Sequence, residues 1–234
     1  KGYKVFTAVF ILIVLLMILY LKYISSLQEE IFNSGDVFYM IYMFFMMGIF
    51  LAFPIVTSSY FKKSNYIKQQ IISSKVSKKS TLLNDTLISS TINFIMFSIV
   101  TIFTIIIVSS LFGNSGMCLN KDSFSVEKFI YHQFTLLLLI ITLSIQAICI
   151  QKIVENQFLS SGIFLLLTYL IPLILMQLRF FSDMISLFSK AFPMCQIAFL
   201  FRGDTNIIQY FIVIILNIII ALGLSNVVIE RKEL

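Results

Sequence analysis

The sequence predicts an all-α integral membrane protein with six transmembrane helices. Of its 234 residues, 59% are hydrophobic and only 12% are charged, whereas charged residues make up about a quarter of a soluble protein. The apolar runs are long and uninterrupted, unlike the alternating pattern of a transmembrane β-strand. Each run also approaches the roughly 20 residues that a helix needs to cross a hydrocarbon core about 30 Å thick.

We expect a single transmembrane domain over residues 1–234. Its predicted spans are Val5–Leu21, Val37–Val56, Leu87–Leu111, Phe129–Ile150, Phe158–Met176 and Ile207–Ile229. No small-residue cleavage site follows the first run, so we expect a retained helix and not a signal peptide. The chain begins at Lys1 and not at methionine, and we expect further residues before it.

The distribution of charge predicts the orientation. With both termini in the cytoplasm, the inner segments carry eleven of the 17 lysines and arginines and four of the 11 acids. Short cytoplasmic loops are enriched in lysine and arginine, so this arrangement is the favoured one. The net charge of +6 therefore indicates topology, and we expect no nucleic-acid partner.

The connection 57–86 is long, lysine-rich and predicted to be cytoplasmic. Ile67, Ile71, Ile72 and Val76 recur at helical spacing, and Lys68, Gln70 and Lys75 lie between them. This pattern predicts a short amphipathic helix on the membrane face. The residues leave two roles open, an interfacial anchor for anionic lipid and a docking helix for a soluble partner.

The connection 177–206 is predicted to lie on the outer side of the membrane. Its apolar run 191–201 is too short to cross the membrane. Pro193 would break any helix that continued from the upstream half of this connection into the run. Upstream, Leu178, Phe181, Ile185 and Phe188 fall at helical steps. We expect two short re-entrant helices that return through Arg202, with an ordinary amphipathic surface loop as the alternative.

The predicted spans contain no Asp, Glu, Lys or Arg. An ion-coupled carrier needs an ionisable group at depth, so this absence counts against one. Neutral polar residues do occur at depth, and each could hydrogen-bond a neighbouring helix or line a substrate path: Asn93, Thr101, Gln146, Thr168 and Asn217.

Motifs for catalysis and metal binding are missing. The eight glycines never form a phosphate-binding loop, and no zinc-protease or serine-hydrolase motif occurs. We therefore expect a non-catalytic chain without cofactor or metal. Cys149, inside a span, is expected to act as a small apolar residue, and a disulfide between Cys118 and Cys195 stays open.

Together these features resemble the ABC-2 type, or type V, permeases of ABC exporters. The resemblance covers the whole chain and is clearest in two stretches. The stretch 66–80, YIKQQIISSKVSKKS, is similar to the family's cytoplasmic coupling helix, although Lys75 stands where the family usually has proline. The stretch 192–203, FPMCQIAFLFRG, is similar to its re-entrant pair before the last span.

The resemblance implies a bacterial cytoplasmic membrane protein that exports amphipathic or antimicrobial peptides, or confers immunity to them. It implies two ABC ATPase subunits that bind ATP and Mg²⁺, and a second permease that is a copy or a relative. The implied ATPase-coupling residues are Tyr66, Ile67, Lys68, Gln70, Ile71, Ser74 and Lys75. Alternatives are a stand-alone immunity or sensor protein that binds a peptide, and an ion-coupled carrier.

Overall fold

The structure, a computed structural model, describes residues 12, 15, 16, 18–20, 22, 23, 52, 54–58, 78–112, 126–154, 156–202 and 205–231. Every element in these ranges is helical, which confirms the predicted all-α class for the described part of the chain. The coupling segment around Tyr66–Lys75 and most of the first two predicted spans lie outside the described residues.

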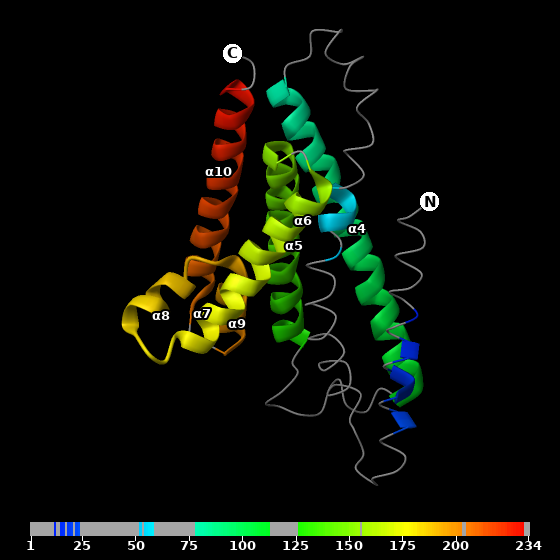
Figure 1. Cartoon of the computed structure of the whole chain (residues 1–234). Helices are drawn as coiled ribbons and strands as arrows, with labels where there is room; N and C mark the ends of the chain where they lie inside the picture. The colour runs from blue at the N-terminus through cyan, green and yellow to red at the C-terminus, as the bar shows by residue number, and fades with distance from the viewer. Residues whose placement is uncertain are drawn as a thin grey trace. The chain divides into compact units, whose positions relative to one another are not determined.

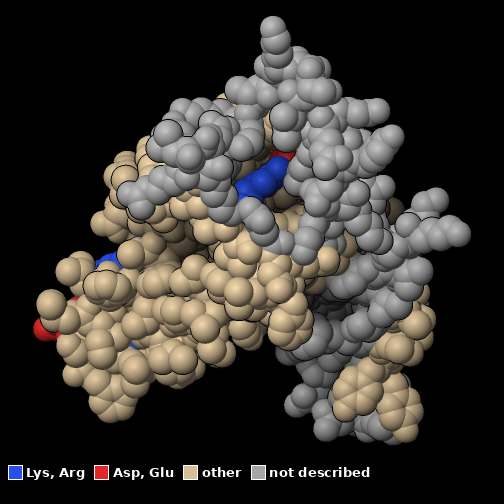
Figure 2. Space-filling view, turned by 45° about the horizontal axis from the view of Figure 1, so that its top comes forward, with Lys and Arg blue, Asp and Glu red and all other residues tan. Residues whose placement is uncertain are grey.

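Four described helical segments are long and apolar enough to cross a membrane, which indicates a membrane protein. They are Ser80–Thr104 in α4 (Lys78–Phe112), Gln133–Val154 in α5 (Val126–Val154), Gln157–Leu178, and Ile207–Val228 in α10 (Ile207–Arg231). Each overlaps one of the predicted spans from the third to the sixth. The face shown in Figure 2 carries few charged side chains among the described residues.

The span Gln157–Leu178 is built from three consecutive helical pieces. These are α6 (Gln157–Leu165), the π-helical turn η1 (Leu166–Leu170) and α7 (Ile171–Leu178). Asn156 begins α6 by accepting hydrogen bonds from the backbone N–H groups of Phe158 and Leu159. The π-turn precedes Pro172, which has no N–H to offer the carbonyl of Thr168, so the regular helical ladder cannot continue there.

Two short helices follow α7, as the sequence predicted for this connection, and Figure 1 shows them near the N-terminal end of α10. They are α8 (Asp183–Ser189) and α9 (Pro193–Arg202). Pro193 is the first residue of α9, where its missing N–H costs no helical hydrogen bond. Their insertion into the outer leaflet stays a prediction.

One detail of that prediction is wrong. Phe181 was expected on the first short helix, but it lies in the turn between α7 and α8, where its N–H donates to the carbonyl of Leu178 (3.0 Å). The helix begins only after Ser182, whose backbone is extended and whose carbonyl accepts from Ser186 N–H (3.0 Å). The helical spacing of Leu178, Phe181, Ile185 and Phe188 therefore extends across the turn between α7 and α8, and so it did not indicate where one helix ends and the next begins.

The chain separates into two compact units, Lys1–Ile49 with Ile95–Phe134, and Phe50–Phe94 with Thr135–Leu234. In the first, Ile18 is fully buried while Leu12, Leu16 and Tyr20 are exposed. The second contains every contact described below.

Hydrogen bonds within the second unit set the directions of three helices. Asn93 on α4 pairs with Ser144 on α5, and Asp85 pairs with Lys152, so these stretches run antiparallel. Tyr210 Oη donates to the carbonyl of Thr135 (2.5 Å). Further along both helices, Gln146 donates to Asn217 (3.2 Å), so α5 and α10 run parallel. These directions are those expected for the third, fourth and sixth of consecutive spans.

Candidate functional site

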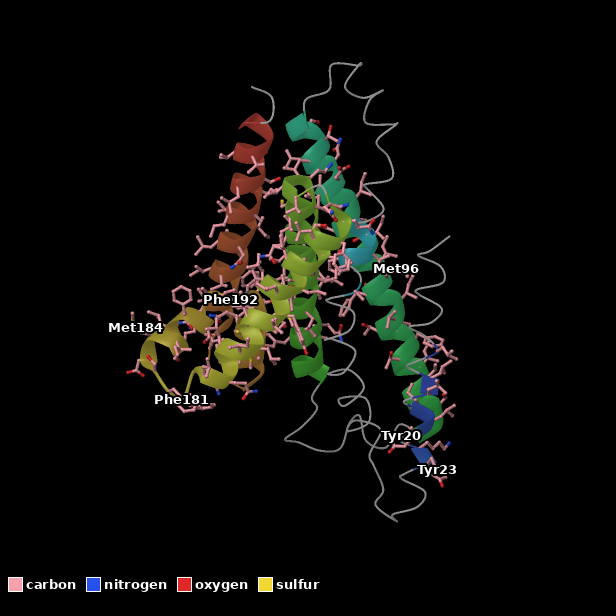
Figure 3. All side chains as sticks on the ribbon, viewed as in Figure 1. Tyr20, Tyr23, Met96, Phe181, Met184 and Phe192 are labelled. Carbon is pink, nitrogen blue, oxygen red and sulfur yellow. The ribbon has the colours of Figure 1, made fainter. Side chains whose placement is uncertain are left out.

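Three of the predicted polar residues line one cavity in the second unit. Gln146 comes from α5, Thr168 from η1 and Asn217 from α10. The cavity has a volume of about 220 Å³, and the residues around the start of α9 close another of its sides, with Phe192 and Met194. In Figure 3 the labelled Phe192 lies among the helices, whereas Phe181 and Met184 lie at the edge of the α7–α8 region. The helices thus bring together side chains that are far apart in the sequence.

The cavity is mostly apolar and electrically neutral. None of the described residues that line it is an acid, a lysine, an arginine or a histidine. Its polar groups are the two amides, the hydroxyl of Thr168 and the thiol of Cys149. Thr168 Oγ1 already donates to the carbonyl of Phe164 (2.7 Å). A lining of this composition can bind an uncharged group.

The two amides form a small network across the cavity wall. Gln146 Nε2 donates to Asn217 Oδ1 (3.2 Å). Asn217 Nδ2 donates to the carbonyls of Val213, one turn earlier on α10 (2.9 Å), and Ala191, just before α9 (3.0 Å). One amide therefore ties together α5, α10 and the α8–α9 connection.

The π-turn and α9 meet beside the cavity. Cys195 Sγ lies 3.4 Å from the carbonyl of Pro172 and links α9 to α7. Burial raises the pKa of the Cys195 thiol to about 12, and the positive charge of Arg179 opposes part of this rise. Arg179 also stacks on the rings of Phe180 and Phe199, with its guanidinium carbon 4.6 and 5.0 Å from the ring centroids. Cys195 is a free thiol.

Asn93 lies in a separate buried cluster. Its Nδ2 donates to the hydroxyls of Thr57 (3.0 Å) and Ser144 (2.7 Å), and Ser89 also donates to Thr57 (3.1 Å). All four side chains are nearly inaccessible to solvent. In this structure Asn93 therefore joins helices and does not line the cavity.

The other predicted residues have simple placements. Thr101 lies half-buried on α4, in the first compact unit. Phe188 is exposed on α8 and Phe181 is exposed in the preceding turn. Pro193 lines the cavity, and Arg202 is the last residue of α9. The predicted coupling residues lie outside the described part of the chain.

The expectation that no charged residue lies within a span needs correction. The candidate spans in α4 and α5 extend beyond the predicted apolar runs, and they include Asp85 and Lys152. Lys152 Nζ donates to Asp85 Oδ2, and both side chains are largely buried, with 14–16% exposed. Because each charge neutralises the other, both helices can continue past the ends of their apolar runs.

Sequence reasoning also missed Cys149, Phe192 and Met194 as cavity-lining residues. Nothing in their local pattern marks them, because apolar side chains within apolar segments carry no positional signal. A hint for the ion pair did exist: Asp85 and Lys152 are the charges nearest to the cytoplasmic ends of the third and fourth predicted spans.

Comparisons with protein-family models, with curated proteins and with solved structures give no match to this chain. The geometry and the sequence pattern therefore carry the functional argument.

Proposed function

We propose that this chain is the transmembrane subunit of an ATP-driven exporter whose ATPase is a separate polypeptide. The observation that carries the proposal is the neutral cavity between α5, η1 and α10. It can hold an uncharged group, yet its described lining has no carboxylate, amine or imidazole to couple binding to an ion gradient. The energy for transport would then come from another subunit.

The expected substrate is an amphipathic or antimicrobial peptide, moved out of the cell or out of the membrane. Support comes from the apolar surface around α8, where Phe180, Phe181, Met184, Leu187 and Phe188 are all exposed. Phenylalanine and methionine adapt to varied apolar partners, and exposed patches of this kind mark membrane or ligand contacts.

The expected assembly contains two such permeases, as copies or relatives, and two ABC ATPase subunits in a bacterial cytoplasmic membrane. ATP and Mg²⁺ would bind to the ATPases, and both termini of this chain would be cytoplasmic. These features follow from the resemblance and from the lysine distribution.

The central experiment is purification of the chain in mild detergent with its partner, followed by measurement of associated ATP hydrolysis. We expect Ile71→Asp to abolish association, because it puts a charge on the apolar side of the predicted coupling helix. Ser73→Asp adds the same charge on the side opposite the centre of the apolar residues and should leave association intact. Equal behaviour of the two variants would refute the docking role of this segment.

Topology gives an independent check. In a chain whose three native cysteines are replaced by serine, a cysteine at position 70 should resist a membrane-impermeant reagent in intact cells and react after lysis. Labelling in intact cells would place the segment outside and overturn the proposal. Protection against a peptide in cells that lack any partner ATPase would instead indicate a stand-alone immunity or sensor protein.

The Asp85–Lys152 pair favours a second candidate, an ion-coupled carrier. Both residues lie near one end of their candidate spans and neutralise each other, which is a weak arrangement for coupling at mid-membrane depth. A carrier predicts transport by the purified chain alone under an imposed proton gradient, and loss of that transport in Asp85→Asn. An exporter shows no such transport without its ATPase.

A further inference from the structure

The cavity between α5, η1 and α10 begins at the middle of its helices. Gln146, Thr168 and Asn217 each lie ten to thirteen residues from the start of a 22-residue candidate span. Because a helix rises 1.5 Å per residue, they lie about 15–20 Å from that end, near the middle of a hydrocarbon core about 30 Å thick. The carbonyl of Ala191 accepts from Asn217, so the start of α9 lies at this depth as well.

From this level the cavity extends toward the C-terminal ends of α5 and α10. Its lining reaches Ile153 on α5 and Leu224 on α10, each seven residues beyond the amide on the same helix. These two helices run parallel, so both give the cavity a length of about 10 Å. A volume of about 220 Å³ over about 10 Å leaves a cross-section of about 20 Å². The cavity is therefore narrow and lies along the direction of the lipid chains.

One side of the cavity opens toward lipid. Three of its lining residues are about half exposed, Leu167 on η1 and both Ile220 and Leu224 on α10. They belong to two candidate membrane spans, whose other surfaces also carry exposed leucine and isoleucine. Hydrocarbon is the solvent around such helices. The opening therefore faces acyl chains and not water.

The polar groups of the lining need nothing from an occupant. Asn217 Nδ2 donates to two backbone carbonyls, and its Oδ1 accepts from Gln146. Thr168 Oγ1 donates to the carbonyl of Phe164. The unpartnered Oε1 of Gln146 is buried beyond the reach of an occupant. Most of the lining side chains that an occupant can touch are apolar, among them Ile150, Ile153, Phe192, Met194, Ala221 and Leu224.

We propose that this cavity binds one acyl chain of a membrane phospholipid, with the methyl end of the chain beside Phe192 and Met194. Apolar walls give water no partners, and an empty space would forfeit the dispersion contacts that a chain supplies. Acyl chains also end near the middle of a bilayer, where the cavity is closed by the start of α9.

The lipid comes from the leaflet at the C-terminal ends of α5 and α10, which the lysine distribution predicts to be cytoplasmic. The inference goes beyond the exporter proposal, because it requires only that these helices span a membrane. Binding of the chain requires neither ATP nor a partner protein.

A photoreactive lipid tests this binding in the full chain. Phosphatidylcholine with a diazirine at the methyl end of one acyl chain is added at low fraction to dioleoyl phosphatidylcholine nanodiscs and illuminated. Mass spectrometry then locates the adducts. A second lipid, with the diazirine beside the ester, reports on the other end of the chain. We expect the methyl-end probe to label Phe192 and Met194 roughly tenfold more than the ester-end probe, since the two diazirines lie at different depths.

Two leucine substitutions on α10 distinguish the cavity from the surrounding lipid. Ala221→Leu fills the lining and should lower adducts on Phe192 and Met194 roughly tenfold, because a packed space has no room for a chain. Gly223→Leu is the matched control, since a Cβ at this glycine meets no atom within 4 Å, and it should leave the adducts unchanged. Leu216, half exposed and outside the lining, should be labelled equally in all three chains. Thermal unfolding shows whether each variant is folded.

Methyl-end adducts confined to outward-facing residues such as Leu216 would overturn the proposal, and this result needs no variant. Equal labelling of Phe192 in the wild type and in Ala221→Leu would also overturn it, because the probe would then reach Phe192 by another route. The assay contains no ATPase, so loss of ATPase association does not affect lipid binding. The two proposals can therefore fail separately.

Discussion

Replacing Lys152 by methionine removes one half of the ion pair that joins α4 to α5. Methionine retains most of the side-chain volume and its apolar stem, so the main change is the loss of the positive charge. The carboxylate of Asp85, whose side chain is 14% exposed in the wild type, is then left without its partner between two helices. Within the described part of the chain, Lys152 is the ion-pair partner given for Asp85.

The expected loss of stability can be bounded. Removing one partner of a fully buried pair costs about 3–5 kcal/mol, because a charge is left without compensation. Exposed pairs contribute about 0–1 kcal/mol. The partial exposure of Asp85 and Lys152 places the pair between these two cases, and we expect Lys152→Met to cost about 2 kcal/mol, roughly a 30-fold change in the unfolding constant.

The assay is reversible unfolding of the purified chain in mixed micelles, with increasing denaturing detergent. Asp85→Asn leaves Lys152 unpaired and should cost a similar amount, so a double-mutant cycle with Lys152→Met should give a coupling energy of about 4 kcal/mol. The double variant should be nearly as stable as the wild type, because no charge remains unpaired. Lys190→Met makes the same chemical change at an exposed position and should alter stability by less than about 0.5 kcal/mol. Additive single effects would refute the contact.

Three further outcomes test the second unit. Tyr210→Phe should cost about 1 kcal/mol in the same unfolding assay, since it deletes the hydrogen bond to the carbonyl of Thr135; an unchanged midpoint would contradict that contact. Asn93→Leu loses two inter-side-chain hydrogen bonds at about 0.6 kcal/mol each but also removes its buried, unpartnered Oδ1, so the expected net cost is below about 1 kcal/mol. With the other two cysteines changed to serine, Cys195 should react slowly with a maleimide at pH 8, because burial raises its pKa to about 12, and quickly once denatured; equal rates would show an accessible thiol.

The Cys195 shift also fixes the sign of a pH effect. A thiol with a raised folded pKa contributes stability that is fully present below its unperturbed pKa of about 9. That contribution is lost as the pH rises from there toward the folded pKa of about 12. Cys195→Ala should therefore flatten the loss of stability between these values.

Much of the fold was predictable because lipid imposes a simple requirement on sequence. A crossing helix needs about 20 apolar residues, and the runs beginning near Leu87, Phe129, Phe158 and Ile207 meet it. Pro193 correctly marked the division between the two short helices. Helix ends were less predictable: α4 begins at Lys78, because paired and back-bonded polar groups can prolong a helix beyond its apolar run.

The candidate site was predictable only in its residue types. Gln146, Thr168 and Asn217 were notable as polar groups at depth, but nothing in their spacing shows that they surround one cavity while Asn93 does not. Pro172 explains the π-turn η1 that precedes it, but the sequence did not predict this turn, because many helices accommodate a proline by a kink instead. The donor and acceptor roles of the amides emerged only from their neighbours.

By itself the sequence determined the class, the approximate positions of four helices and the lack of known catalytic motifs, because hydrophobicity and local breakers act over short distances along the chain. The tertiary structure alone decided which polar groups meet: Asp85 with Lys152, Asn93 with Ser144, and Gln146 with Asn217. These partners are separated by 67, 51 and 71 residues. Their contacts depend on how whole helices pack, since a polar group in an apolar environment seeks whichever partner the packing brings within reach.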